Sequence, residues 1–551
     1  MSRFTRTALA GASALAALAL ITGCASGAGT PAASESDAAP QQGGTLTYLE
    51  PQTWTTLYPP SAGFYPNGGL VNNITDRLLY QNPETLELEP WIATDYTVND
   101  DATEYTFDLR QGVTYSDGTP LTAANVVKNI DLYGKGDKDR ALPVSEAINN
   151  YDHGEVVDDD TVVFHFTAPS PGFAQAVSTI NSGLLSDATL DRASEGFGPG
   201  NATDIIGSGP FVISGEEIGT KTSVTARKDY DWAPASLKHQ GAAYLDGVDY
   251  VVAAENSVRV GTVVAGQADI ARNIPAPDEA QFAASGLSLY AAATNGVNNG
   301  LSFRFRDARL EDVRVRQALI AGIDRQQIVD TLFTANYPLA TGALAKTALG
   351  YVDTSEYYTY DPDKAAKLLD EAGWTLGSDG TRQKDGEKLS LTFNEALPQP
   401  RSKEVVTLIQ EQLGKLGIEV SLFAGDMAAQ TKASTDQSTI QVYHSMVGRA
   451  DFDVLKSQYY SKNRNTLLNL NPADQTIGDP ELDTLLLAIA SEPTTDERQA
   501  ASEAAQKYLA ENAYILPIFE EPQVFGLTSK VHGFETESVG RPSFYSTWLV
   551  G

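Results

Sequence analysis

The chain has 551 residues and a formal net charge of −32, an acidic balance that argues against nucleic acid as a partner and against electrostatic adhesion to anionic lipid. The acidic balance does not imply disorder, because 42% of the residues are hydrophobic and 24 Tyr and 19 Phe are spread along the chain. This length exceeds what one hydrophobic core usually serves, so two or three lobes are expected.

The N-terminus has the layout of a secretory signal. Arg3 and Arg6 precede an almost unbroken run of Ala, Leu, Gly and Ser from Ala8 to Ile21, and small residues follow it. This run is shorter than the roughly 20 apolar residues that a helix needs to cross a bilayer. The single cysteine of the chain, Cys24, comes directly after Ile-Thr-Gly, and this phrase resembles the bacterial lipobox.

The sequence therefore predicts a lipoprotein signal peptide over residues 1–23 and lipidation of Cys24. A lone exported thiol has no disulfide partner, and a diacylglycerol thioether with an added N-acyl chain anchors stably, whereas one chain is marginal. The alternative is an ordinary signal peptide with a cysteine there by chance. Residues 24–42 are rich in Ala, Ser, Gly and Pro and contain no aromatic side chain, so we expect a flexible tether.

The folded body is predicted to begin near Gly43, where residues 45–49 alternate as a strand does. Two further half-buried strands are expected at residues 105–110 and 161–166. Between them, Thr122 can cap a helix over residues 123–132.

The second half of the chain alternates helices with strands. Helical spacing extends over residues 312–332, Asp361 and Pro362 open a helix that ends at Gly373, and a third helix runs from about Ser402 to Leu416. The remaining predicted elements are a strand at 418–422, a long helix at 496–512 and a buried segment at 515–519. Helix, glycine and strand in succession are typical of an α/β lobe. We expect residues 295–513 to form a lobe inserted into a body made by the first and last parts of the chain, with a hinge at the two crossings.

Several phrases in a fixed order now resemble one known family, the extracytoplasmic solute-binding proteins of the oligopeptide, dipeptide and nickel class that serve ABC importers. The similarity extends from about Gly43 to Trp548. The phrases are residues 105–123, Gly207-Ser-Gly-Pro-Phe211, Tyr244-Leu-Asp-Gly-Val248, Asp312-Val-Arg-Val-Arg-Gln-Ala-Leu319, residues 323–329 and residues 360–374.

The resemblance implies an α/β fold of two lobes, a periplasmic-binding-protein-like clamp of the class II type with an extra small subdomain. The implied division is lobe I at 43–294, with the small subdomain at about 75–204, lobe II inserted at 295–513, and a return to lobe I at 514–551. A lipid-anchored protein of this kind captures a peptide or similar solute on the extracytoplasmic face of the cell membrane and delivers it to ABC permease subunits. We expect a monomer without a cofactor, a bound metal or a catalytic residue.

In the resembling family, the stretch after the first strand forms one wall of the cleft. Here that stretch is unusually aromatic, and we select Trp54, Phe64, Tyr65 and Asn67 as candidate ligand-binding residues. Aromatic rings offer a large contact area at little entropic cost. The alternative is that Phe64 and Tyr65 only pack the lobe.

The family's peptide binders use an acidic residue in an Ala-Asp-Tyr or Ala-Asp-Phe phrase to pair with the α-ammonium of the ligand, and the matching residue here is Asp451. This sequence departs from the family pattern just before it, because Gly448 and Arg449 stand where the family commonly has a Trp two or three residues ahead of the acid. Arg449 could neutralise Asp451 or Asp453, or could bind a carboxylate or sulfonate of the ligand. Ser445, on the strand that leads into this loop, is a further candidate.

Other functions were weighed against this one. A secreted hydrolase lacks support, because neither Gly-x-Ser-x-Gly nor His-Glu-x-x-His occurs. A carrier of a chelated metal, an opine, a sugar or a sulfonate on the same fold remains open, as does a signalling or adhesion lipoprotein. The five histidines are far apart in sequence and give no first shell for a bare metal ion.

Overall fold

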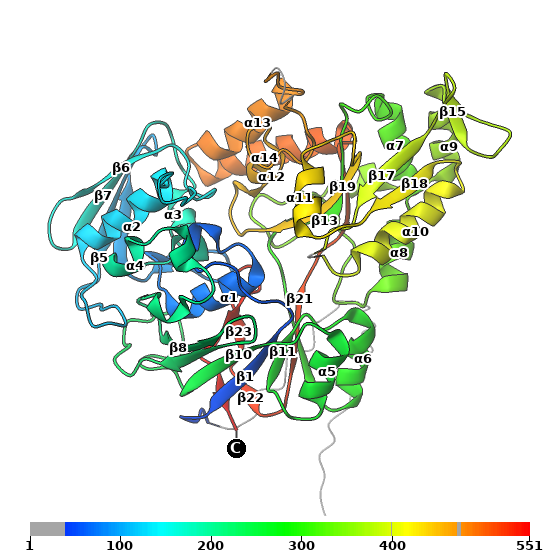
Figure 1. The fold of residues 1–551 in the computed structure, drawn as a ribbon. Helices are drawn as coiled ribbons and strands as arrows, with labels where there is room; N and C mark the ends of the chain where they lie inside the picture. The colour runs from blue at the N-terminus through cyan, green and yellow to red at the C-terminus, as the bar shows by residue number, and fades with distance from the viewer. Residues whose placement is uncertain (1–38, 398, 471–474, 551) are drawn as a thin grey trace, which may run out of the picture. The chain divides into compact units, whose positions relative to one another are not determined.

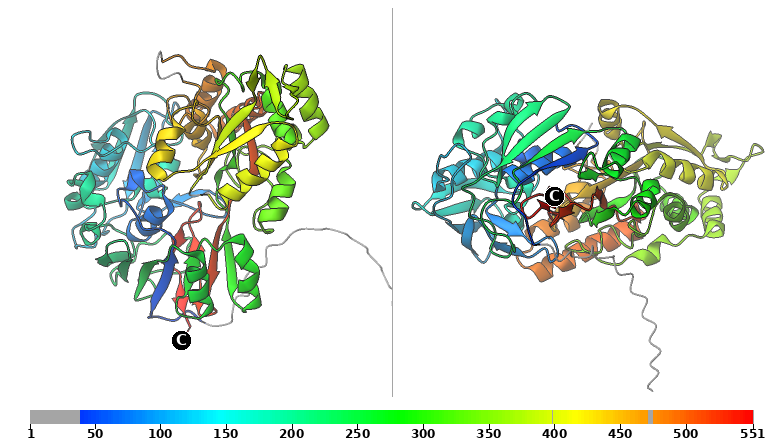
Figure 2. Two further views of the ribbon diagram at one scale, coloured as in Figure 1. Left: turned by 45° about the vertical axis from the view of Figure 1, so that its right-hand side comes forward. Right: turned by 90° about the horizontal axis from the view of Figure 1, so that it is seen from below.

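The computed structural model describes residues 39–397, 399–470 and 475–550, and the chain from Pro40 onward forms one compact unit. The predicted signal peptide, Cys24 and most of the predicted tether lie outside the described residues. Three main sheets organise the unit, and Figure 1 shows them in separate regions of the ribbon, as do the turned views of Figure 2.

The first lobe is built on a seven-stranded sheet that begins with the predicted first strand. Parallel pairing joins β1 to β10 and to β11, and the other neighbours are antiparallel. In order across the sheet, the strands are β12 (Ser288–Ala292), β21 (Gln523–Leu527), β11 (Ile270–Arg272), β1 (Thr45–Glu50), β10 (Gly247–Val252), β9 (Lys221–Ala226) and β8 (Phe211–Glu217). Helices α1 (Tyr65–Ile74), α5 (Asn256–Val264) and α6 (Ala276–Ala284) belong to the same lobe.

The small subdomain contains an antiparallel sheet of four strands, drawn in blue to cyan in Figure 1. Its strands in order are β4 (Ala93–Val98), β5 (Glu104–Leu109), β7 (Thr161–Phe166) and β6 (Tyr151–Val156). Helix α2 (Ala123–Lys135) packs on it and starts where predicted, because the Thr122 side chain accepts a hydrogen bond from the Asn125 amide. One apolar cluster runs from Leu46 of the first lobe through Phe107 and Phe164 of this sheet to Tyr545, so the subdomain and the first lobe share a core.

The second lobe is built on a five-stranded sheet in which β13, fully buried along its length, is flanked by β19 and β20. In order, its strands are β18 (Glu419–Phe423), β17 (Ser390–Asn394), β19 (Val442–Gly448), β13 (Gly296–Phe303) and β20 (Ile515–Phe519). Its helices are α7 (Val313–Gly322), α8 (Arg325–Leu332), α9 (Pro362–Glu371), α10 (Ser402–Gly414), α11 (Met427–Ser434), α12 (Val454–Tyr459), α13 (Pro480–Ser491) and α14 (Thr495–Glu511).

Two sequence expectations differ from these elements. The helical pattern over residues 312–332 is two helices, because Asp324 leaves the helical conformation and its side chain accepts from the Gln327 amide to start α8. The predicted return to the first lobe at residue 514 comes later in the chain. Strand β20 pairs with β13 of the second lobe, and the first strand back in the seven-stranded sheet is β21.

The remaining short elements lie in loops and at the C-terminal end. They are η1 (Pro59–Ser61), η2 (Ile180–Ser182), η3 (Ser194–Phe197), η4 (Ala202–Asp204), η5 (Ser355–Tyr358), α3 (Phe173–Ala176), α4 (Asp187–Leu190), β2 (Leu79–Gln81), β3 (Leu88–Pro90), β14 (Thr375–Leu376), β15 (Arg382–Lys384), β16 (Glu387–Lys388), β22 (Val531–His532), β23 (Glu535–Thr536), β24 (Pro542–Ser543) and β25 (Trp548–Leu549).

Candidate functional site

The edge of the first sheet where the chain crosses between the lobes is the candidate site. The parallel strands β1, β10 and β11 end there at Glu50, Val252 and Arg272. Both crossings, residues 293–295 and 520–522, leave from the same edge, since Ala292 pairs with Gln523 next to these strand ends. In open α/β sheets, ligands bind outside the carboxyl ends of the strands. This edge, facing the second lobe, is therefore where a solute would be held.

Tyr65, the first residue of α1, reaches this edge from the first lobe. Two guanidinium groups lie over its ring, with the Arg272 and Arg541 carbons at 5.2 and 5.0 Å from the ring centroid. Its hydroxyl donates to the Val539 carbonyl at 2.9 Å, and a Cβ built on Gly448 would lie 3.4 Å from it. Burial raises the pKa of Tyr65 to about 12, so the phenol is neutral. Tyr65 thus contacts the end of β19 in the second lobe.

Trp54, Asn67 and Phe64, the other candidates from this loop, are placed differently. The Trp54 indole N–H donates to Thr222 Oγ1 at 2.9 Å, and the side chain is buried in the first core. Asn67 Oδ1 accepts from the Thr55 amide at 2.8 Å, which fixes the loop that precedes α1. Phe64 is partly buried at the residue before that helix. The polar atoms of Trp54 and Asn67 are thus hydrogen-bonded to other residues of the first lobe.

Arg449 and Asp451 follow β19 and pair with each other. Arg449 Nε donates to Asp451 Oδ2 and Arg449 Nη2 donates to Asp451 Oδ1, both at 2.8 Å. The two side chains are only 13% and 6% exposed. Burial alone would lower the pKa of Arg449, but the Asp451 carboxylate outweighs it and raises the pKa. The sequence left open whether Arg449 pairs with an acid of the chain or binds an anionic group of the ligand. In the structure, its Nε and Nη2 atoms pair with Asp451.

The carboxylate of Asp451 is also tied to the backbone, because Oδ1 accepts from the Asp453 amide at 2.9 Å. Both of its oxygens are thus engaged within the chain. Ser445, earlier on β19, accepts from Gln458 Nε2 at 3.0 Å through its hydroxyl. The structure therefore brings Tyr65 and the Gly448–Arg449 corner together, whereas Ser445 faces α12.

Polar side chains of the small subdomain contact the segment that follows Asp451, and the sequence analysis missed them. Asn149 Nδ2 donates to Asp453 Oδ2 at 2.9 Å, and Lys456 Nζ donates to Asn149 Oδ1 at 2.8 Å. Glu146 Oε2 accepts from Arg464 Nη2 at 3.0 Å. These contacts join two lobes, so a hinge motion that separates the lobes must break them. No local pattern marks residues 146–149 as anything but a polar loop.

A second missed group lies at the crossing over residues 520–522. Glu521 Oε2 accepts from Asn299 Nδ2 at 2.9 Å, and Asn299 Oδ1 lies 2.7 Å from His444 Nε2. The other ring nitrogen, Nδ1, lies 2.9 Å from Ser402 Oγ. Burial raises the pKa of Glu521 to about 8 and lowers the pKa of His444 to about 4. The group therefore holds a buried, neutral His444 against the hinge.

Two hollows beside the candidate residues are of water size. One of about 20 Å³ adjoins Trp54, and one of about 10 Å³ adjoins Ser445. A water needs roughly 10 to 15 Å³ by this measure, so neither hollow admits a solute in this arrangement. A ligand would have to enter with the lobes further apart.

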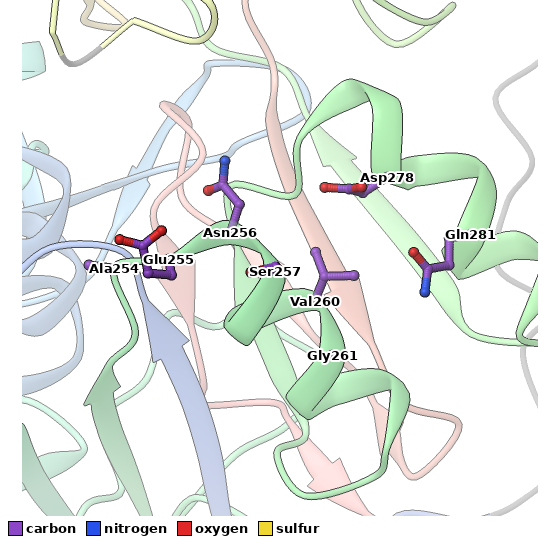
Figure 3. A pocket seen from close by; sticks show the side chains of 8 residues that line it. All are labelled: Ala254, Glu255, Asn256, Ser257, Val260, Gly261, Asp278 and Gln281. Carbon is purple, nitrogen blue, oxygen red and sulfur yellow. The ribbon is translucent and has the colours of Figure 1, made fainter.

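A larger hollow of about 560 Å³ opens at the starts of α5 and α6, and Figure 3 shows its lining. Glu255 and Asp278 are its two carboxylates, and every lining residue belongs to the first lobe. Beneath it, Arg259 is fully buried and donates to the carbonyls of Ala253 and Arg272. None of the side chains selected from the sequence lines this hollow.

Comparison with known proteins decides the family. Residues 87–466 match the bacterial extracellular solute-binding proteins, family 5, middle. The chain belongs to this family. It is a family of solute-binding proteins rather than enzymes, as the sequence predicted. Among curated relatives, the glutathione-binding protein GsiB of Salmonella typhi is 24% identical over 495 residues, which cover 87% of this chain and 90% of the relative.

Solved structures of the same architecture confirm the fold class, a two-lobe α/β clamp of the class II type. The oligopeptide-binding protein AppA of Bacillus subtilis, solved with a nonapeptide, has a TM-score of 0.76 at 21% identity, with 93% of this chain and all of AppA covered. NikA of Brucella suis, solved with Fe(III)-EDTA, also has a TM-score of 0.76, at 22% identity, with 92% of this chain and all of NikA covered. Because these similar folds hold such different ligands, the fold alone does not assign the cargo.

Metal ligands and membrane-spanning helices can be assessed for residues 39–397, 399–470 and 475–550. Within them, no group of three or more His, Cys, Asp and Glu side chains has an arrangement that could hold a metal ion. Within the same residues, no helix is both long and apolar enough to cross a membrane.

Proposed function

We propose that this member of the solute-binding family is the lipid-anchored component of an ABC importer, which captures a peptide or similar small solute between its two lobes and delivers it to the permease. The observation that carries the proposal is the meeting of Tyr65 with the Gly448–Arg449 corner across the two crossings. The division into lobe I, its subdomain and an inserted lobe II is part of the same proposal.

Closure of the lobes is the step that captures the solute. A ligand shifts a two-state equilibrium only by its difference in affinity for the two states. In the closed state, the ligand touches both lobes, and the contacts of Asn149 and Glu146 with the second lobe add to its stability. The permease then binds surfaces of both lobes, and ATP hydrolysed by other subunits drives their separation.

Scattering and mass spectrometry test the capture step. Small-angle scattering of the purified mature protein should show a smaller radius of gyration after a mixture of tripeptides and tetrapeptides is added. Native mass spectrometry should find a small solute carried through purification and released by mild unfolding. A protein that binds none of these solutes and shows no compaction would contradict the proposal.

Anchoring and delivery are the finer parts of the proposal. The lipobox-like phrase before Cys24 supports a lipid anchor on the extracytoplasmic face of the cell membrane. Pull-down of the detergent-solubilised protein should recover permease subunits, and adding the solute that co-purifies should increase the yield. Equal recovery with and without that solute would contradict delivery by the closed form.

A further inference from the structure

The guanidinium group of Arg449 has one edge without a hydrogen-bond partner among the described residues. A guanidinium carries five N–H donors, and its pairing with Asp451 occupies only the edge formed by Nε and Nη2. The Nη1 atom is buried and finds no hydrogen-bond partner among the described residues. The edge formed by Nη1 and Nη2 therefore keeps two parallel N–H groups, the arrangement that matches both oxygens of a carboxylate.

The acidic side chains around Arg449 have other partners. Asp453 accepts from Arg498 and from Asn149. Glu146 accepts from Ser457 and from Arg464. These carboxylates are thus directed to other donors, although their charges act on Arg449 from a distance. The unused edge is left for an acceptor from outside the chain, because an unsatisfied buried donor is costly.

The local charge also favours an anion. Four cations stand against three carboxylates in this cluster, although the whole chain has a net charge of −32. The cations are Arg449, Lys456, Arg464 and Arg498, and the carboxylates are Asp451, Asp453 and Glu146. Lys456 acts on Arg449 electrostatically, and within the described residues its three N–H donors make one hydrogen bond, to Asn149.

The cluster lies where the lobes meet. The Arg449 amide donates to the Asn295 carbonyl of the first crossing at 2.9 Å. Asn149 of the small subdomain bridges Asp453 and Lys456 from the opposite side. Separation of the lobes would uncover this corner, and their closure would bury a ligand's charge next to the unused edge. A charge-assisted hydrogen bond is strongest in such a water-poor place.

We propose that the unused edge of Arg449, assisted by Lys456, binds a carboxylate of the cargo, so that the cargo of this protein is an acid. The inference rests on the proposed function and deepens it by naming a chemical class. Because Asp451 is already neutralised by Arg449, a free amine on the cargo contributes little.

Three peptide libraries test the inference. Randomised tetrapeptides with a free C-terminal carboxylate, with a C-terminal amide, or with an acetylated N-terminus are equilibrated with the mature protein, and the retained peptides are identified by mass spectrometry. We expect free acids to be retained about tenfold or more over amides, since each 1.4 kcal/mol is tenfold in affinity, and acetylation to have little effect. Amides that are retained only when they contain Asp or Glu would support the same site with a side-chain carboxylate.

The variants separate binding from folding. Arg449→Gln alone leaves Asp451 unpaired, so the test variant is the double Arg449→Gln/Asp451→Asn, which should retain acids and amides equally. The control is Lys507→Gln, whose side chain is 48% exposed and pairs with Glu503 outside this cluster, and it should keep the preference for acids. Equal retention of acids and amides by the wild-type protein overturns the carboxylate site alone. Retention of no peptide overturns the proposed peptide function and this inference with it.

Discussion

Asp451→Asn should destabilise the second lobe strongly, because it removes one half of a buried ion pair. The Asp451 and Arg449 side chains are 6% and 13% exposed, and two hydrogen bonds of 2.8 Å join them. Breaking a buried pair by removing one partner costs about 3 to 5 kcal/mol, since an uncompensated charge remains. Asp453 and Glu146 still act on Arg449, so we expect the lower end, a loss of about 3 kcal/mol in the free energy of unfolding.

Urea unfolding at pH 7, followed by tryptophan fluorescence and circular dichroism, measures this loss. The double variant Arg449→Gln/Asp451→Asn leaves no unpaired charge and should recover a large part of it. The matched control is Glu503→Gln, which breaks an exposed pair with Lys507 and should cost no more than about 0.5 kcal/mol. If Asp451→Asn costs as little as Glu503→Gln, the Arg449–Asp451 pair is not buried in solution and the reasoning fails.

The remaining predictions concern the anchor and two buried titratable groups. Cys24→Ser should move the protein from the membrane fraction to the medium, and unchanged fractionation would defeat the lipid anchor. Glu521 has a folded pKa of about 8, above its ordinary 4.5, so its contribution to stability is lost as the pH rises from about 4.5 to 8. This loss amounts to up to about 5 kcal/mol in the free energy of unfolding. Glu521→Gln should remove most of it, which denaturant unfolding at pH 5 and pH 8 measures. His444 has a folded pKa of about 4, below its ordinary 6.5, so its contribution to stability is lost as the pH falls from about 6.5 to 4. This loss is about 3 kcal/mol. His444→Gln should remove the fall in the free energy of unfolding over this pH range.

Local sequence signals predicted most of the regular elements. The capping side chains of Thr122 and Asp361 mark the starts of α2 and α9 in the sequence, and both accept the expected backbone hydrogen bonds. The error over residues 312–332 has the same origin, because Asp324 also caps and divides the apolar pattern into two helices. Apolar periodicity predicts the buried face of a helix. It does not detect a break when the helices on both sides of the break continue the same apolar spacing.

Sheet membership and contacts between distant residues were beyond the sequence. Residues 515–519 read as a buried strand, yet only the pairing of β20 with β13 shows which lobe holds them. The contacts of Asn149 with Asp453 and Lys456 join residues about 300 positions apart, and no local pattern encodes them. Asp451 was found because it matches a family phrase and Arg449 because it departs from one, while their mutual pairing needed the geometry.

The candidate loop shows how composition can mislead about exposure. Its aromatic residues suggested a wall for a ligand, but the Trp54 indole N–H is bonded to Thr222 and the ring is buried in the core. Tyr65 differs because it begins a helix at the edge where both crossings leave the first sheet. This position in the topology is what distinguishes Tyr65 from Trp54.

The two sides of the interface between the lobes differ in the polarity of their contacts. On the crossing side, one apolar cluster joins Leu49, Phe282 and Val524 of the first lobe to Phe519 and Leu301 of the second. On the subdomain side, the lobes meet mainly through amides and charged groups that water can replace, such as Asn149 and Glu146, beside one small apolar cluster of Leu86 with Ala450. The lobes should therefore separate on the subdomain side and rotate about the apolar contacts at the crossings. A solute would then enter and leave from the subdomain side.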